Sequence, residues 1–232
     1  MKSVAIILAA GVGVRMNSKT PKQYMYIGNY PMVYYSLATF NSSRINDIVL
    51  VVNKGDEKKC KREFIGKYKL NKIKTIVAGG KERAESVYKG LMACEEDYDV
   101  AIIHDAARPM VTVGMIDGAL SGASIYKSVE YAVPAKDTIK RADSEGLVIE
   151  CLDRSELWLM QTPQAFDYKL CKDSYTKLIE GEENISSYTD DAMVVEKLGG
   201  VSTKLLMGDY KNIKVTTPED AIIARVYLDD AN

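Results

Sequence analysis

Short apolar runs rich in β-branched residues alternate with segments of helical pattern along the first half of the chain. The apolar runs are residues 4–8, 48–52 and 100–103, and residues 73–77 are predicted to form a further strand. Continuous apolar runs of this length are typical of strands that are buried on both faces. Strands that alternate with helices predict an α/β fold, in which a mostly parallel sheet has right-handed crossovers and carries helices on both faces.

The helical segments lie between and after these runs. The clearest covers residues 82–94, where apolar side chains recur on one stripe of the helix. The last helix opens at Thr217, a residue type that favours the N-cap position, and Pro218 then occupies the first helical position. We expect the other helices at residues 31–40, 54–68, 168–179 and 190–198, and a late strand at residues 203–207.

The pattern changes between residues 129 and 158. Two short strand-like runs, 129–133 and 147–152, flank a polar stretch at residues 136–146 that has little to bury. We interpret residues 133–158 as a projecting hairpin arm inserted in a single domain that spans residues 1–232. Because an isolated hairpin is marginally stable in water, we expect the arm to pack on a second copy of the chain and to form a homodimer.

Composition excludes several classes of function. The formal net charge is -1, which does not favour a nucleic-acid partner. With one histidine and no C-x-x-C spacing among the four cysteines, a Cys/His zinc site is not expected. The apolar segment at residues 4–10 is too short to span a membrane, and no signal peptide precedes it. Reduced thiols then fit a cytoplasmic protein.

A glycine-rich loop follows the first predicted strand. Residues 8–16 read Leu-Ala-Ala-Gly-Val-Gly-Val-Arg-Met, and their small side chains leave backbone N–H groups open to an anion. The loop lacks the Gly-Lys-Ser/Thr ending of a P-loop, and Met16 replaces the third glycine of the dinucleotide-binding pattern. Taken alone, the motif is equally compatible with a tight strand-to-helix turn.

The charges around this loop favour phosphate binding. No Asp or Glu occurs in residues 1–46, whereas Arg15, Lys19 and Lys22 cluster just beyond the glycines. An ordinary solvated surface mixes both signs of charge. Arg15 could bind two phosphate oxygens through its fork, and Lys22 could act as a point charge.

Several motifs in register resemble a known enzyme family. The first is the glycine-rich loop with Pro21-Lys22-Gln23. The others are Gly79-Gly80-x-x-Arg83-x-x-Ser86, His104-Asp-Ala-Ala-Arg-Pro109, Asp137-Thr-Ile-Lys140, Asp153-Arg154, Gln161-Thr-Pro-Gln164, Thr189-Asp190 and Asn212-Ile-Lys-Val215. This ordered set spans nearly the whole chain and resembles the 2-C-methyl-D-erythritol 4-phosphate cytidylyltransferases of non-mevalonate isoprenoid biosynthesis.

The resemblance implies a Rossmann-like nucleotide-binding domain and a transferase that joins CTP to a small polyol phosphate and releases pyrophosphate. It also implies that the arm of one subunit reaches the active site of its partner. Ribitol-5-phosphate cytidylyltransferases share the first loop and the Thr-Pro-Gln block and remain an alternative. Uridylyl or thymidylyl transferases and a non-catalytic nucleotide-binding protein are more distant alternatives.

The resemblance also implies roles for individual residues. Arg15, Lys22, Lys214 and Arg154 are the predicted catalytic residues, and Asp105 is the predicted ligand of Mg²⁺, although an Asp at this place could instead cap a helix. The predicted nucleotide-binding residues are Ala9, Ala10, Gly11, Gly13, Gly80, Ser86, Asp105 and Ala106, with Arg83 nearby. The predicted polyol-phosphate residues are Arg108, Thr138, Arg154, Thr162 and Thr189. His104 is interpreted as a structural hydrogen-bonding residue.

Overall fold

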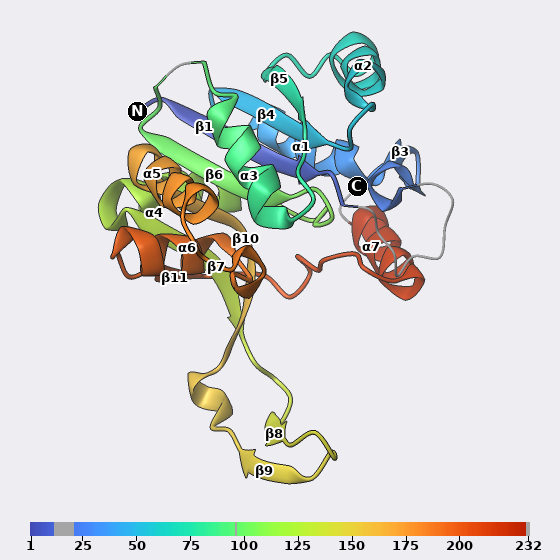
Figure 1. Cartoon of the computed structure of the whole chain (residues 1–232). Coiled ribbons are helices and arrows are strands. Elements are labelled where there is room, and N and C mark those ends of the chain that lie inside the picture. Colours follow the sequence, from blue (N-terminus) through green and yellow to red (C-terminus); the bar gives the residue numbers. More distant parts are fainter. Residues whose placement is uncertain (12–20, 96, 231–232) are drawn as a thin grey trace.

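The computed structural model describes residues 1–11, 21–95 and 97–230, and its main feature is a seven-stranded sheet (Figure 1). The strand order is β11-β7-β10-β6-β1-β4-β5. β10 runs antiparallel to both of its neighbours, and the other neighbouring strands pair in parallel. The strands are β1 Ser3–Ala9, β4 Asp47–Val52, β5 Ile73–Ala78, β6 Val100–Asp105, β7 Ser128–Pro134, β10 Trp158–Asp167 and β11 Lys204–Met207. The predicted mostly parallel α/β fold is confirmed.

Alternate residues of the central strands face two separate cores. In β1, Ala5 and Ile7 belong to one apolar cluster, whereas Val4 and Ile6 belong to the other. All four side chains are buried, because helices cover both faces of the sheet. This two-sided burial explains why the strands read as continuous apolar runs in the sequence.

Two sets of helices cover the two faces. The first set comprises α1 Met32–Ser42, α2 Glu57–Cys60 with the π-helical segment η3 Lys61–Lys67, and α4 Val113–Tyr126. The second set comprises α3 Arg83–Met92, α5 Tyr168–Glu180, and α6 Asp191–Val194 with the π-helical segment η6 Val195–Gly199. Gly90 of α3 lies against the sheet, where an added Cβ would be 2.5 Å from Ile6 Cγ2, so glycine permits the close approach of α3.

The expected helices are present with small differences at their ends. The helix expected from residue 82 begins at Arg83, because Glu82 is its N-cap and forms a capping box with Glu85. Among the longer elements, α4 and β10 were not predicted from the sequence. Pro163 lies inside β10, and proline argues against an inner strand. It is accommodated where the register of β10 with β7 shifts between Met160 and Gln164.

The arm differs in part from the prediction. The hairpin consists of β8 Lys140–Ala142 and β9 Val148–Cys151, and the 3-10 turn η4 Arg154–Glu156 follows it. It projects away from the rest of the molecule (Figure 1). The run at residues 129–133 was expected to form one side of the hairpin, which is wrong. It lies in β7 between β10 and β11, where all five of its residues are buried, including Glu130.

A third apolar cluster joins the beginning and the end of the chain. It contains Ile27 of β2 Tyr26–Ile27, Met32 of α1 and Ala224 of α7 Pro218–Asp230. Thr217 caps α7 as expected, since Thr217 Oγ1 accepts from Asp220 N at 3.4 Å and Asp220 Oδ2 accepts from Thr217 N at 2.9 Å. The remaining short elements are η2 Lys22–Tyr24, β3 Tyr30–Pro31 and η5 Ile185–Ser187.

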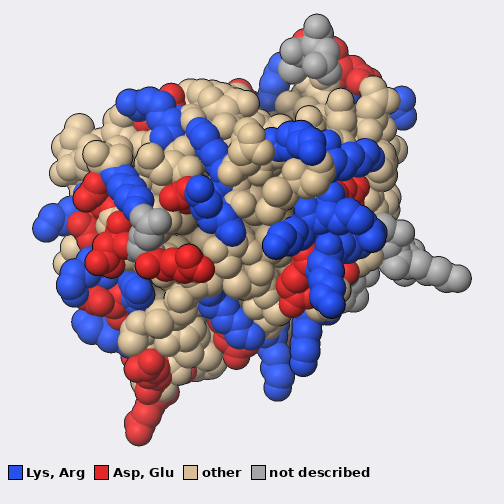
Figure 2. Space-filling model, turned by 90° about the horizontal axis from the view of Figure 1, so that it is seen from above, with Lys and Arg blue, Asp and Glu red and all other residues tan. Residues whose placement is uncertain are grey.

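The surface charge, the cysteines and the hydropathy of the helices also bear on function. On the face seen from above, Lys and Arg side chains are interspersed with Asp and Glu (Figure 2). The cysteines Cys60, Cys94, Cys151 and Cys171 are free thiols. Among the residues that the structure describes, no helix combines the length and the hydropathy needed to cross a bilayer.

Candidate active site

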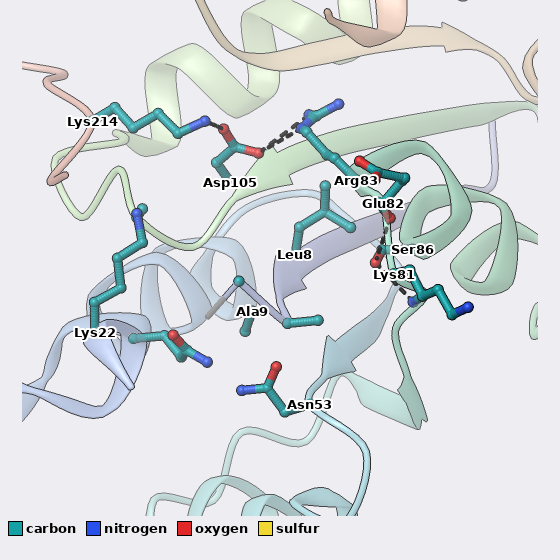
Figure 3. Close-up of a pocket in the computed structure, with 15 residues that line it drawn as sticks. Leu8, Ala9, Lys22, Asn53, Lys81, Glu82, Arg83, Ser86, Asp105 and Lys214 are labelled. Carbon is teal, nitrogen blue, oxygen red and sulfur yellow. Dashed lines mark hydrogen bonds and ion pairs between the residues drawn. The ribbon is translucent and has the colours of Figure 1, made fainter. Parts of the chain in front are cut away.

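A cavity of about 390 Å³ lies where β1, β5 and β6 end. These are the carboxyl ends of parallel strands, the edge at which α/β sheets bind ligands. The lining residues come from the strand ends and from the segments that follow them. They are Leu8, Ala9, Ala10, Gly11, Lys22, Gln23, Asn53, Gly80, Lys81, Glu82, Arg83, Ser86, Asp105, Ala107 and Lys214 (Figure 3). We call this space the nucleotide cavity, after the predicted nucleotide-binding residues among its lining.

A second cavity of about 240 Å³ adjoins the first. Its lining comes mainly from β10 and from the segment before α6. It consists of Arg83, Asp105, Arg108, Met160, Gln161, Thr162, Gln164, Thr189, Asp190 and Lys214. We call it the acceptor cavity, after the predicted polyol-phosphate residues among its lining. Arg83, Asp105 and Lys214 line both cavities and therefore form their common wall.

One wall of the nucleotide cavity is built from closely packed small residues. An added Cβ on Gly79 would lie 2.5 Å from Ala10 Cβ and 2.8 Å from Ser86 Oγ, so only glycine fits there. Ser86 Oγ accepts a hydrogen bond from Gly80 N at 3.0 Å and donates to Glu82 O at 3.2 Å. These contacts fix the turn between β5 and α3 and leave small groups facing the cavity.

Two lysines approach the nucleotide cavity from different parts of the chain. Lys22 Nζ donates to Val215 O at 3.0 Å, and Lys214 Nζ lies 2.6 Å from Asp105 Oδ2. Figure 3 shows both lysine side chains on the same side of the cavity, with Arg83 beyond Asp105. The tertiary structure thus brings Arg83 and Lys214 to one carboxylate and places Lys22 in the lining of the same cavity.

Asp105 ends β6 and is ionised in this setting. Its Oδ1 accepts from Arg83 Nε at 3.2 Å, and its Oδ2 is paired with Lys214. Burial alone would raise the pKa of the Asp105 carboxyl, but the charges of Arg83 and Lys214 outweigh burial and lower this pKa well below its ordinary value. The carboxylate therefore stays charged at neutral pH.

His104 has a structural role. Asp105 N donates to Thr162 Oγ1 at 3.1 Å, so the single hydroxyl proton of Thr162 is available for His104 Nδ1 at 2.9 Å. The His104 Nε2–H then donates to Arg108 O at 3.3 Å. Burial lowers the pKa of His104 to about 3, so the imidazole is neutral. His104 also lines neither cavity.

Three of the predicted polyol-phosphate residues line the acceptor cavity. They are Arg108, Thr162 and Thr189. Arg108 is held by backbone carbonyls, with Nη1 donating to Asn212 O at 2.7 Å and Nη2 donating to Met160 O at 3.1 Å. Its buried Nε has no hydrogen-bond partner among the described residues. Arg108 is therefore positioned before any anion is present.

Other predicted residues lie elsewhere. Ala106 is fully buried in the core, and its neighbour Ala107 lines the nucleotide cavity instead. Thr138 and Arg154 are exposed on the arm and line neither cavity of their own chain. Arg154 Nη1 instead donates to Lys136 O at 2.9 Å. Gly13 and Arg15 lie outside the described residues. The other predicted residues of the nucleotide set line the nucleotide cavity, as do Lys22 and Lys214.

Some residues of the site were missed in the sequence. Asn53 follows β4, whose apolar run was identified, and its place after a strand end was an available signal. Asp191 gave no such signal, because it meets Arg83 only in the folded chain. It lines neither cavity itself.

The carboxylates of the site allow only one kind of magnesium site. Within residues 1–11, 21–95 and 97–230, no group of three or more His, Cys, Asp or Glu side chains could hold a metal. Asp105 places one carboxylate at the common wall. This donor set fits Mg²⁺ that takes most of its ligands from phosphate oxygens and water.

The chain matches the model of a known family over residues 3–230, and this family is described as IspD, 2-C-methyl-D-erythritol 4-phosphate cytidylyltransferase. The chain belongs to this family. Membership makes it a nucleotidyltransferase with the α/β fold described above.

Individual relatives agree with this assignment. The chain is 44% identical to 2-C-methyl-D-erythritol 4-phosphate cytidylyltransferase of Alkaliphilus metalliredigens, over 98% of this chain and 93% of that one. Identity to the enzyme of the same name from Clostridium botulinum is 42%, with 98% of each chain covered. Among solved structures, 4-diphosphocytidyl-2C-methyl-D-erythritol synthase of Anaerococcus prevotii has a TM-score of 0.84 and 32% identity, with 98% of this chain and 96% of that chain covered.

Proposed function

We propose that the chain transfers the cytidylyl group of CTP to 2-C-methyl-D-erythritol 4-phosphate, giving 4-diphosphocytidyl-2-C-methyl-D-erythritol and pyrophosphate. The family membership supports this reaction. The structural observation that carries it is the common wall, because Arg83, Asp105 and Lys214 line both cavities. Two anionic substrates bound in adjoining cavities would meet at these three side chains.

The nucleotide cavity suits CTP in its shape and charge. Ala9, Ala10, Gly11 and Gly80 present backbone and small side chains, which allow a base and its phosphates to approach closely. Lys22 and Lys214 place positive charge at one side of this cavity for the triphosphate. We assign Gly13 and Arg15 of the same loop to the triphosphate from the sequence motif alone.

The acceptor cavity suits the polyol phosphate. Arg108 supplies a prepositioned guanidinium, and Thr162 and Thr189 supply hydroxyl groups near it. A substrate rich in hydroxyls requires polar partners when it is taken from water. The attacking phosphate would then lie beside the common wall.

The proposed chemistry is a single in-line displacement. A phosphate oxygen of the acceptor attacks the α-phosphorus of CTP, the bond from that phosphorus to the α,β-bridging oxygen breaks, and pyrophosphate leaves with the electron pair. A phosphomonoester has its second pKa near ~6, so the nucleophile is largely dianionic at neutral pH and needs no general base. This agrees with the neutral, buried state of His104.

The enzyme residues supply positioning and charge neutralisation. Lys22 and Lys214 would stabilise the negative charge that accumulates on the α-phosphate and the leaving group. Asp105 would hold Mg²⁺ together with the phosphate oxygens, and the bound ion would neutralise part of the triphosphate charge. Binding of the α-phosphate would also compete for Lys214, which Asp105 holds in the free enzyme.

We assign the arm to a homodimer interface, with Arg154 and Thr138 serving the acceptor cavity of the partner subunit. The hairpin exposes Leu147, Val148 and Ile149, whose exposed fractions are 64%, 58% and 53%. Exposed apolar surface of this kind marks protein contacts. A two-stranded hairpin also needs packing from elsewhere.

We place the enzyme in the cytoplasm on the basis of its thiols. The four cysteines are unpaired, and Cys60 and Cys171 are buried. Unpaired thiols are typical of reducing compartments.

A substrate panel tests the proposal. The purified protein is given CTP, UTP or dTTP with magnesium and either 2-C-methyl-D-erythritol 4-phosphate or ribitol 5-phosphate, and released pyrophosphate is measured. We expect release with CTP and the methylerythritol substrate. Faster release with ribitol 5-phosphate, a preference for UTP or dTTP, or binding of CTP without release in any combination would each contradict the proposal. Lys58→Ala, an exposed lysine of α2 outside both cavities, is the control variant.

A further inference from the structure

A buried carboxylate outside both cavities contacts the common wall. Asp191, the first residue of α6, is fully buried, and its two oxygens accept from Arg83 Nη1 and Nη2 at 2.7 Å each. A buried carboxylate is costly unless it is paired and hydrogen-bonded. A bidentate arginine with two short contacts is the strongest form of such pairing.

The same guanidinium also contacts Asp105. Arg83 Nε and Nη2 both lie 3.2 Å from Asp105 Oδ1, and Asp105 Oδ2 in turn holds Lys214 Nζ at 2.6 Å. Four charged groups of alternating sign therefore form one row, in the order Asp191, Arg83, Asp105 and Lys214. The first member lies outside the cavities and the other three form their common wall.

Asp191 is itself held in place by the sheet. The backbone N–H groups of Asp191 and Ala192 donate to Gln164 Oε1 at 3.1 and 3.0 Å. Gln164 belongs to β10, and its amide nitrogen donates to the buried Glu130 of β7 at 2.8 Å. The hydroxyl of Tyr175 on α5 also donates to Asp191. The beginning of α6 is thus anchored to two strands and to a neighbouring helix.

We propose that Asp191 is a positioning residue for the transfer reaction: by occupying one edge of the Arg83 guanidinium, it keeps Asp105 available to Lys214 at the wall between the two cavities. This inference rests on the function proposed above. Without the Asp191 charge, Arg83 would turn both of its terminal nitrogens to its remaining carboxylate, Asp105. Lys214 would then lose the contact that fixes its ammonium group.

The loss of Asp191 should affect binding and turnover in opposite directions. Removal of one negative charge leaves an additional positive charge beside the cavity that takes the triphosphate. CTP should therefore bind at least as tightly, and without metal about threefold more tightly. Turnover should fall by roughly tenfold or more, because small displacements of aligned groups are costly for reaction. A purely structural residue would weaken both properties together.

The test compares Asp191→Asn with Tyr175→Phe, which removes another hydrogen bond to the same carboxylate and leaves the Arg83 fork intact. We expect Asp191→Asn to lower kcat and also to lower the Kd of metal-free CTP, which is measured by calorimetry. We expect Tyr175→Phe to lower the melting temperature while kcat and Kd stay within about twofold of wild type. Weaker CTP binding in Asp191→Asn, or an equal loss of kcat in Tyr175→Phe, would overturn the inference.

The double variant R83Q/D191N provides a second test, because one member of a buried ion pair left alone can prevent folding. It removes both charges and should fold with kcat reduced roughly tenfold or more. Where R83Q also folds alone, the double variant should turn over at the same rate as R83Q, since Asp191 acts only through Arg83. A further large loss of kcat in the double variant relative to R83Q would contradict the inference, because Asp191 would then act by a route other than Arg83. If the wild-type protein releases no pyrophosphate, the proposed function fails, and the direction of the change in CTP affinity alone decides the role of Asp191.

Discussion

Lys214 Nζ and Asp105 Oδ2 lie 2.6 Å apart, although the two residues are far apart in the chain. Asp105 ends a central strand, whereas Lys214 lies in the segment between β11 and α7. Their contact closes the common wall of the two cavities. It also prepares Lys214 for a new partner, because a phosphate oxygen entering the cavity would offer a second negative group at the same ammonium.

We expect Lys214→Ala to reduce kcat about 10²-fold, by analogy with the loss of one preorganised donor to a developing charge. Steady-state kinetics and calorimetry with CTP separate this effect from a loss of affinity. Lys58→Ala, on the exposed surface of α2, should behave as wild type. A change confined to the KM for CTP would contradict the assignment of Lys214 to the transition state.

Lys22→Ala should reduce turnover more than it reduces CTP affinity, with a loss in kcat of roughly 10²-fold. The physical reason is that the charge of Lys22 would stabilise the transition state, in which negative charge accumulates on the phosphates, more than it stabilises bound CTP. Because Lys22 also donates to Val215 O, the melting temperature of the variant must be measured as well. Rates near wild type would remove Lys22 from the reaction.

Subunit mixing tests whether Arg154 acts on the partner's acceptor cavity. Arg154→Ala and Lys22→Ala homodimers should each be weakly active. In a mixed dimer, one site combines an intact body with an intact arm, so an exchanged equimolar mixture should recover about a quarter of the wild-type rate. Absence of any recovery, with subunit exchange shown by light scattering and labelled subunits, would show that Arg154 acts within its own chain or not at all.

Thr162→Val should lower the free energy of unfolding by about 1–3 kcal/mol, because it leaves Asp105 N–H and His104 Nδ1 without their partner. Thr162→Ser is the matched control, since it keeps the hydroxyl and should restore most of the stability. Chemical denaturation of the three proteins at one pH makes the comparison. Equal stability of the Val and Ser variants would contradict the hydrogen-bonding role of this hydroxyl.

Glu130→Gln should stabilise the protein in a pH-dependent manner. Burial, with smaller contributions from Asp190 and Glu196, raises the pKa of Glu130 from 4.5 to about 8. Below pH 4.5 both the folded and the unfolded chain carry the proton, so this group has no pH-dependent effect there. As the pH rises toward 8, the unfolded chain releases the proton and the folded chain retains it, which lowers the free energy of unfolding of the wild type.

The gain from Glu130→Gln should therefore be small near pH 4.5 and on the order of 3 kcal/mol near pH 7 to 8. Denaturation curves at pH 5 and pH 8 measure it. Glu145→Gln, in the exposed turn of the arm, is the control and should show no such dependence. A gain of the same size at both pH values would show that Glu130 does not carry a shifted proton.

The sequence by itself determined the class of fold and the family. The runs that form β1, β4 and β6 are apolar on both faces of the strand, so a sheet made of them must be covered on both sides. This local property predicts the layered sheet. The glycine-rich loop and Asp105 were singled out because they lie at strand ends, where parallel sheets bind ligands. Lys22 was singled out because it belongs to a cluster of cations in a segment without acidic residues. The family followed from motifs whose order along the chain is a property of the sequence alone.

Only the tertiary structure decided which residues meet. Residues 129–133 read as an exposed hairpin strand, but pairing with β10 and β11 placed them inside the sheet. Asp191 carries no local signal, because its role depends on a guanidinium 108 residues earlier in the chain. Burial, ion pairing and the pKa of a side chain are set by neighbours that are distant in sequence, so the row from Asp191 to Lys214 exists only once the sheet has brought α3, α6 and the last segment together.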